Sequence, residues 1–187
     1  MPYSPAHKQK TRDHIVECAR MLFNQHGFEN VSIDMVMERA GLTRGGFYNH
    51  FKSKEALFAA AVDSFLMGRG ARWRDEAGVH DTEGPAAAER MVASYLSSEH
   101  QGDLEGQCPL IALPSDISRG SEEVKIAYES LLKAMVGLFE SSLSSTGKEA
   151  HETALTLSAL CVGGNDHAPD TQRRECQGCF VSLLARR

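Results

Sequence analysis

The sequence predicts an all-α protein in which a three-helix helix-turn-helix domain precedes a larger helical domain. Apolar residues recur with the α-helical period along the chain, and no segment alternates apolar and polar residues as a half-buried strand does. Two short helical patterns near residue 40 are joined by a turn that contains glycine, as in a helix-turn-helix motif. The 187 residues, 42% of them hydrophobic, suffice for a small domain and one domain with its own core. We expect these domains at residues 1–54 and 55–187, linked by a helix that begins near residue 54.

The first helix is predicted from Lys8 to His26. Its apolar positions share one helical face and are Ile15, Cys18, Ala19, Leu22 and Phe23. Gly27 follows this pattern and is the expected stop signal. With Gly27 as the residue after the cap, Phe28 and Phe23 are expected to touch, as in glycine-terminated helix ends.

Two short helices follow. Ser32 is the expected N-cap of the second helix, and Gly41 ends it. The third helix is predicted over residues 42–51, with Thr43 as its cap. Phe47 and Phe51 lie four residues apart, so one stripe can anchor this helix while the other face stays free.

The free face of residues 42–51 carries groups suited to DNA. The side chains of Arg44, Tyr48, Asn49 and His50 can hydrogen-bond phosphates or base edges. They flank two adjacent glycines, Gly45 and Gly46. Each glycine costs about 1 kcal/mol in a helix interior. Close approach by a DNA strand would account for that cost. The alternative is a surface helix with a flexible start.

Ser53 is expected to cap a further helix that runs to about Ala77, with Lys54 at its start. A cation there is mildly unfavourable against the helix dipole, which an anionic partner such as a phosphate would explain. A solvated lysine is the alternative.

The segment from Thr11 to Phe58 resembles the DNA-binding domain of the tetracycline-repressor (TetR) family of bacterial transcription regulators. The resemblance rests on Gly27-Phe28, on Ala40-Gly41-Leu42-Thr43 and on the run from Phe47 to Leu57. It implies that Thr43, Tyr48, His50 and Lys54 hold phosphates, with help from Ser32. It also implies that base edges face Arg44, Gly45, Gly46 and Asn49.

Charge is distributed unevenly. Residues 1–54 contain eight Lys and Arg against five Asp and Glu, a net charge of +3, so the rest of the chain carries −8 of the total of −5. A basic end on an acidic body suits a protein that touches DNA at one end.

The remaining segments also read as helices. Pro85 is expected at the first position of one, Cys108-Pro109 begins a segment that Pro114 should kink, and Ser121 opens a long helix that ends at residues 144–147. Further helices are predicted from about His151 to residues 163–164 and from about Thr171. The polar segment of residues 165–175 departs from the apolar stretch usual in the family.

An effector cavity in the second domain is a hypothesis. Large apolar and aromatic side chains at helical spacing could line it, namely Trp73, Met91, Tyr95, Leu113, Met135 and Phe139. Ordinary core packing of these residues is the alternative. Cys108 would cap the helix that begins at Pro109, where backbone N–H groups favour a thiolate that could sense electrophiles or oxidants. The alternative is a small residue packed beneath the preceding loop.

Cys161, His167, Cys176 and Cys179 could in principle close a zinc site, but thiols on a helical apolar face are ordinary core residues. We therefore expect neither a metal nor a cofactor.

Taken together, these features predict a cytoplasmic DNA-binding regulator. We expect a homodimeric repressor that binds a palindromic operator in duplex DNA and is released by a small molecule or by thiol modification. By resemblance, the last two helices of each chain would form the dimer interface. Residues 1–7 lack the apolar core of a secretory signal, no apolar run approaches the ~20 residues of a membrane span, and five cysteines fit a reducing compartment.

Two other classes compete with this interpretation. A thiol-dependent enzyme could use Cys108 with a distant histidine, although the chain has no metalloprotease, phosphate-loop or dinucleotide motif. A helical protein-interaction module could use the same amphipathic faces. Salt-sensitive binding to duplex DNA would separate a regulator from both.

Overall fold

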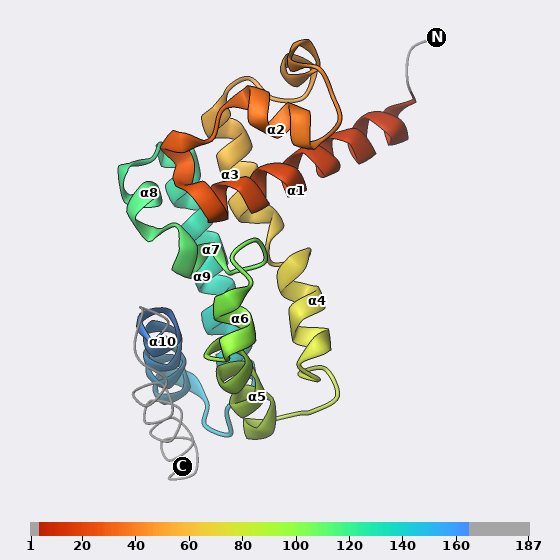
Figure 1. The fold of residues 1–187 in the computed structure, drawn as a ribbon. Helices are drawn as coiled ribbons and strands as arrows, with labels where there is room; N and C mark the ends of the chain where they lie inside the picture. The colour runs from red at the N-terminus through yellow and green to blue at the C-terminus, as the bar shows by residue number, and fades with distance from the viewer. Residues whose placement is uncertain (1–3, 165–187) are drawn as a thin grey trace. The chain divides into compact units, whose positions relative to one another are not determined.

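A computed structural model describes residues 4–164, and the regular elements in that range are all helical (Figure 1). The all-α fold class is thus confirmed over the described residues. The chain forms two compact units. Within the described range, unit 1 comprises residues 4–65 and 104–129, and unit 2 comprises residues 66–103 and 130–164. The domain boundary near residue 54 stays a prediction, and the helix predicted from Thr171 lies outside the described residues.

Unit 1 is built around its first helix. This helix, α1, packs against α2, α3, α7 and α8, and the beginning of α9 completes the unit. The bounds are α1 Pro5–Asn30, α2 Ile33–Arg39, the 3-10 helix η1 Arg44–Asn49, α3 Lys54–Ser64, α7 Pro109–Ala112, α8 Pro114–Arg119 and α9 Glu122–Ser141.

Three phenylalanines form the centre of unit 1. The ring of Phe58 from α3 lies 4.8 Å from that of Phe23 and 4.9 Å from that of Phe28, measured between ring centroids. Phe23 and Phe28 are themselves 5.9 Å apart, which confirms the expected contact across the glycine stop. Gly27 has φ of 74° and ψ of 168°, a non-helical conformation inside α1 that L side chains rarely adopt. The stop signal therefore turns the chain so that Phe28 reaches the core.

The predicted helix starts are largely confirmed. The Ser32 hydroxyl accepts a hydrogen bond from the Met35 amide, and the Ser53 hydroxyl accepts one from the Ala56 amide. Pro85 is the first residue of α5, and the short helices α7 and α8 meet at Leu113, next to Pro114. Each signal acts on backbone groups within about one helical turn.

Two predicted helices are corrected. Residues 44–49 form a 3-10 helix rather than an α-helix, with amide-to-carbonyl bonds from Gly46 to Thr43 and from His50 to Phe47, and Thr43 makes no side-chain cap bond. The helix that begins at Lys54 ends at Ser64, not near Ala77. Residues 65–68 form a turn, and a separate helix begins at Arg69. Gly68 and Gly70 have low helix propensity, which favours the break.

Unit 2 contains four further helices and the second part of α9. They are α4 Arg69–Glu76, α5 Pro85–Tyr95, α6 Ser98–Gly102 and α10 Gly147–Gly163. Helix α10 packs against α5 and begins one turn before the predicted start at His151. No helix among the described residues is long and apolar enough to span a membrane.

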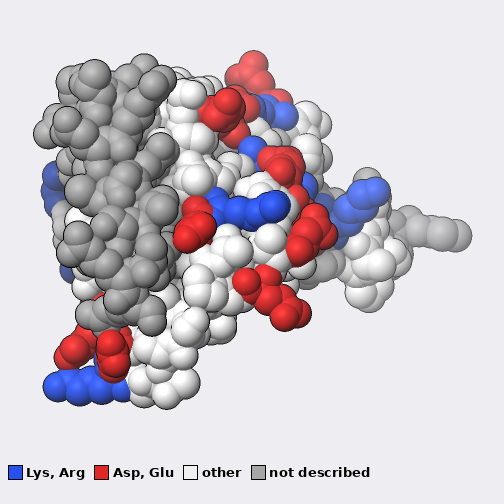
Figure 2. Space-filling model, turned by 90° about the horizontal axis from the view of Figure 1, so that it is seen from below, with Lys and Arg blue, Asp and Glu red and all other residues white. Residues whose placement is uncertain are grey.

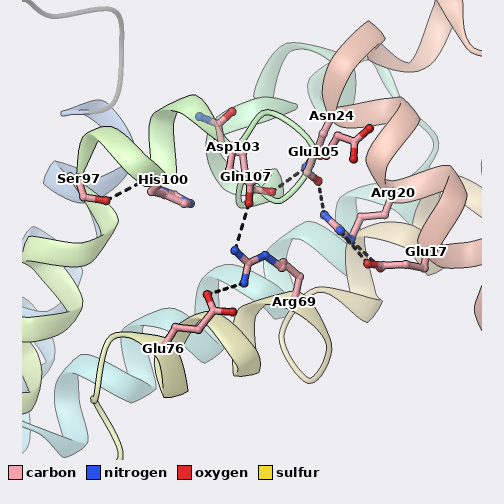
Figure 3. Close-up of polar contacts among 10 residues, drawn as sticks. All are labelled: Glu17, Arg20, Asn24, Arg69, Glu76, Ser97, His100, Asp103, Glu105 and Gln107. Carbon is pink, nitrogen blue, oxygen red and sulfur yellow. Dashed lines mark hydrogen bonds and ion pairs between the residues drawn. The ribbon is translucent and has the colours of Figure 1, made fainter.

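A polar connection holds the loop of residues 104–107 against α1 and α2 (Figure 3). The Arg20 guanidinium is 2% exposed, pairs with Glu17 at 2.9 Å, and donates to the Glu105 carbonyl oxygen at 2.6 Å. The Asn24 amide donates to the Gln107 carbonyl oxygen at 2.7 Å, and Arg39 of α2 pairs with the Glu105 carboxylate at 2.7 Å. A buried charge needs such partners, so these contacts fix the position of the loop on α1 and α2.

Candidate nucleic-acid interface

The turn between α2 and η1 orients the predicted DNA-reading segment. Gly41 adopts φ of 68°, and the Leu42 amide donates back to the Met37 carbonyl oxygen at 2.8 Å, which closes the end of α2. The chain then enters η1 within two residues. Phe47 is 0% exposed and Phe51 is 4% exposed, so the predicted anchoring stripe is buried as expected.

The opposite face of η1 is open. Thr43, Arg44, Gly45, Tyr48 and Asn49 are exposed, and Gly46 and His50 are half-buried. The Tyr48 side chain is 61% exposed, and its ring meets that of Phe47 edge-on at 5.2 Å. The structure therefore brings together all the predicted contact residues of this segment, while their DNA contacts stay predictions.

The two adjacent glycines are not required by the fold. Neither Gly45 nor Gly46 has a positive φ. A Cβ added at Gly45 would meet nothing within 4 Å, and one at Gly46 would meet only the Met37 side chain, at an ordinary 3.6 Å. The backbone and its packing would accept larger residues at both positions, so the protein's own structure does not explain the glycines.

Arg44 has a partner within the motif. Its guanidinium forms an ion pair with the carboxylate of Asp34 in the first turn of α2, and both side chains are more than half exposed. An exposed pair of this kind contributes little to stability. Its effect is to restrict where the guanidinium lies in the free protein.

Ser32 makes the predicted cap contact, whereas Lys54 makes contacts that the sequence did not predict. The Ser32 hydroxyl caps α2, which leaves its own hydrogen available to an acceptor. The Lys54 ammonium donates to the carbonyl oxygens of Phe28 and Val31 at 2.8 and 2.9 Å and lies 4.1 Å above the Phe28 ring. One N–H of Lys54 remains for an external anion, and its phosphate contact stays a prediction.

A basic side chain from α1 also reaches this region. The Arg12 guanidinium donates to the His50 carbonyl oxygen at 3.2 Å and lies 4.0 Å above the Phe51 ring. Burial lowers the pKa of His50, and the charges of Lys8 and Arg12 lower it further. The imidazole is therefore held in its neutral form, in a positive local field.

The beginning of α1 and the η1 segment together line an open groove of about 470 Å³. The α1 residues on its wall, His7, Lys8 and Thr11, were not among the predicted contact residues. The sequence did contain a sign that these residues meet an anion. The first turns of α1 contain no acidic residue, and they carry cations at the end of the helix where its dipole disfavours positive charge.

The face of the molecule seen from below carries charges of both signs. Figure 2 shows a face on which the coloured Asp and Glu side chains are interspersed with Lys and Arg and separated by neutral residues. The described residues of that face form no continuous basic patch of the kind that attracts a DNA backbone.

The predicted effector residues do not all lie in one unit. Cys108 and Leu113 belong to unit 1, whereas Trp73, Met91, Tyr95, Met135 and Phe139 belong to unit 2. In unit 2 the ring of Trp73 meets that of Tyr95 at 5.7 Å and that of His100 at 4.5 Å. The sequence interpretation missed His100. An effector cavity stays a prediction.

His100 is a buried polar residue in this aromatic cluster. Its side chain is 2% exposed, and its Nδ1 lies 2.8 Å from the Tyr95 carbonyl oxygen. The His100 amide donates to the Ser97 hydroxyl (Figure 3). Burial lowers the pKa of His100, although the contact with Tyr95 partly opposes this. The imidazole is therefore neutral near pH 7 and hydrogen-bonds without a charge.

The thiols described by the structure are shielded from solvent. Cys18, Cys108 and Cys161 are all buried, and burial raises the pKa of Cys18. Cys108 does occupy the N-cap position before Pro109, as predicted. Of the four residues considered for zinc, only Cys161 lies within the described range.

Comparison with known proteins adds to this geometry. Residues 15–61 match the family of bacterial regulatory proteins described as the tetR family. Over 168 residues the chain is 25% identical to the HTH-type transcriptional repressor NemR of Escherichia coli K12, covering 83% of this chain and 82% of NemR.

Solved structures share the fold. The reduced form of E. coli NemR superposes with a TM-score of 0.70 at 20% identity, covering 94% of this chain and 96% of that structure. FadR of Bacillus subtilis, solved in complex with stearoyl-CoA, gives a TM-score of 0.68 at 15% identity and covers 91% and 97%. Regulators of this kind are DNA-binding proteins rather than enzymes. Residues 15–61 therefore match the DNA-binding domain of the TetR family, and together with the helix-turn-helix geometry these matches support a DNA-binding transcriptional regulator.

Proposed function

We propose that this regulator binds a palindromic operator as a homodimer, represses the genes beside it, and is released by a small-molecule effector. The observation that carries the DNA-binding part is the open face of η1. Phe47 and Phe51 fix the segment by burial, so the opposite face is presented on a rigid support.

The glycine pair supports close approach to DNA. Because neither backbone conformation nor packing requires Gly45 or Gly46, a partner outside the chain gives the better reason for their lack of a side chain. The neighbouring groups have suitable chemistry. The Arg44 guanidinium matches the acceptor edge of guanine, and the Tyr48 hydroxyl can donate to a phosphate.

The effector is better assigned to non-covalent binding than to thiol modification. Cys108 is 2% exposed, which works against its reaction with an electrophile. FadR of B. subtilis, which shares this fold, has been solved with stearoyl-CoA bound. By analogy, an apolar or aromatic ligand beside Trp73, Tyr95 and His100 is the favoured effector class for this chain. The second candidate, thiol sensing, draws only on the N-cap position of Cys108.

Gly45→Ala provides the sharpest test. An added Cβ meets nothing within 4 Å in the protein, so folding should be unaffected, whereas a methyl group facing DNA should weaken operator binding about tenfold or more, a cost of about 1.4 kcal/mol. The matched control is Gly137→Ala in α9, where a Cβ is equally unobstructed. The operator would first be selected from a random duplex pool, and affinities would be measured by fluorescence anisotropy.

Two further variants separate positioning from base reading. Tyr48→Phe keeps the ring contact with Phe47 and should weaken all duplexes alike. Arg44→Ala should instead change the preferred sequence, at about 1–3 kcal/mol for the affected base pair. Binding that is unchanged in Gly45→Ala, Tyr48→Phe and Arg44→Ala would reject η1 as the DNA-reading segment.

A further inference from the structure

The groove in unit 1 has one wall outside the motif that reads DNA. Its volume is about 470 Å³, and one side is formed by Thr43, Asn49 and His50 of the η1 segment. The other side comes from the exposed first turns of α1, which contribute His7 and Lys8. A ligand on the open face of η1 therefore has a second surface beside it.

The groove has the electrostatic character of an anion site. None of its lining residues is acidic, and Lys8 brings a full positive charge to it. Arg12 adds a second cation at the His50 carbonyl oxygen, and the positive charges of both residues are felt at the His50 ring. The α1 dipole adds its positive end nearby, and the first turn of α1 has no acidic residue to offset it.

The polar groups on the η1 wall can complete the coordination of an anion. The Thr43 hydroxyl makes no cap bond to η1, so it remains available as a donor, and the exposed Asn49 amide has two N–H groups. By contrast, the Thr11 hydroxyl donates to the His7 carbonyl oxygen at 3.0 Å and is therefore engaged within α1. Lys8 and Thr43 are the natural pair of donors across the groove.

We propose that this groove binds a backbone phosphate of the operator, with Lys8 supplying the charge and Thr43 a hydrogen bond from the opposite wall. The proposal rests on the DNA-binding function above and extends the interface to the beginning of α1. A phosphodiester is the occupant that fits, because the groove adjoins the face that meets DNA and carries the complementary charge. Such a contact adds affinity and fixes the docking register without reading sequence.

Lys8→Gln and Lys10→Gln form a matched pair for the test. Both lysines are exposed, two residues apart in the first turns of α1, but only Lys8 lines the groove. Losing one phosphate contact should reduce the slope of log K against log salt by about 0.9 and lower affinity about eightfold at about 0.1 M salt. We expect this loss for Lys8→Gln, equally on the operator and on a scrambled duplex. Lys10→Gln should retain the parental slope.

Phosphate ethylation locates the contact. We expect one phosphate whose ethylation weakens the full-length parent and has no effect on Lys8→Gln. Equal slopes for the two lysine variants, or the same ethylation pattern in Lys8→Gln and the parent, would overturn the groove proposal. That result remains distinct from failure of the proposed function, in which the parent itself would show no salt-dependent binding to any duplex.

Discussion

At the scale of single residues, Cys108 shows how packing can limit the reactivity of a thiol at a helix N-terminus. Its place before Pro109 puts the thiol at the N-cap of α7, a position that in general favours a thiolate, but the side chain makes no cap hydrogen bond there. The side chain is nevertheless 2% exposed, and α7 has only four residues. Burial restricts the access of a reagent to the thiol. The burial of Cys108 therefore weighs against a role as a sensor.

Alkylation kinetics test this conclusion. We expect Cys108 in the native protein to react with iodoacetamide as slowly as the buried Cys18, because neither thiol is accessible. Peptide mass spectrometry over a time course measures both rates, with urea-unfolded protein as the reference for full reactivity. We also expect Cys108→Ser to bind the operator as the parent does. Rapid, selective labelling of Cys108 accompanied by DNA release would restore the thiol-sensing alternative.

At the scale of elements, Lys54 links the end of α1 to the start of α3. The last carbonyl groups of a helix lack intrahelical partners, and the ammonium supplies donors to Phe28 and Val31, at the end of α1 and just beyond it. Its position over the Phe28 ring adds a cation–π contact. A residue predicted to bind phosphate thus also holds the helix-turn-helix unit together, and its removal affects both roles.

Lys54→Met should destabilise the protein by about 1.5 kcal/mol, since hydrogen bonds from a charged donor are lost while the aliphatic stem is kept. Urea unfolding measures the change. Lys52→Met is the control, because Lys52 is 77% exposed and its ion pair with Glu123, at 3.7 Å, lies at the surface. That substitution should alter stability by less than about 0.5 kcal/mol. Equal unfolding midpoints for the two variants would show that the Lys54 contacts contribute nothing measurable.

At the scale of the whole molecule, a regulator with so short a reading segment needs two copies. One η1 segment can contact only a few base pairs, so we expect the operator to be a palindrome with half-sites about one helical turn, or a multiple, apart. Helix α10 offers a surface for the second copy. Its inner face is buried at Ala154 and Leu157, whereas Leu155 and Leu160 remain 44% and 42% exposed.

We therefore expect a dimer at micromolar concentration in sedimentation. Introducing a charge by Leu155→Glu or Leu160→Glu should dissociate it and weaken operator binding, because an unpaired carboxylate would be buried at the interface. Met67→Glu is the matched control, since Met67 is 81% exposed and lies outside α10. A parent protein that sediments as a monomer, with and without operator DNA, would contradict the dimer proposal.

The sequence alone determined the features that depend on neighbours along the chain. Ser32 and Ser53 cap helices, and Gly27 turns the chain toward the Phe23–Phe28 contact. Each signal acts on backbone groups a few residues away, so its outcome can be read from local order. The burial of Phe47 and Phe51 was likewise predicted from their separation of four residues, which the Phe51 amide spans with a hydrogen bond to the Phe47 carbonyl oxygen.

Tertiary structure decided the features that depend on residues distant in sequence. The carbonyl partners of Lys54 lie 26 and 23 residues away, and the Glu105 carbonyl oxygen that receives the Arg20 guanidinium lies 85 residues from Arg20. The burial of Cys108 and the groove beside Lys8 also arise where separate elements meet. Local signals cannot specify such contacts, because packing of the whole unit determines which side chains lose water and which carbonyl groups need a donor.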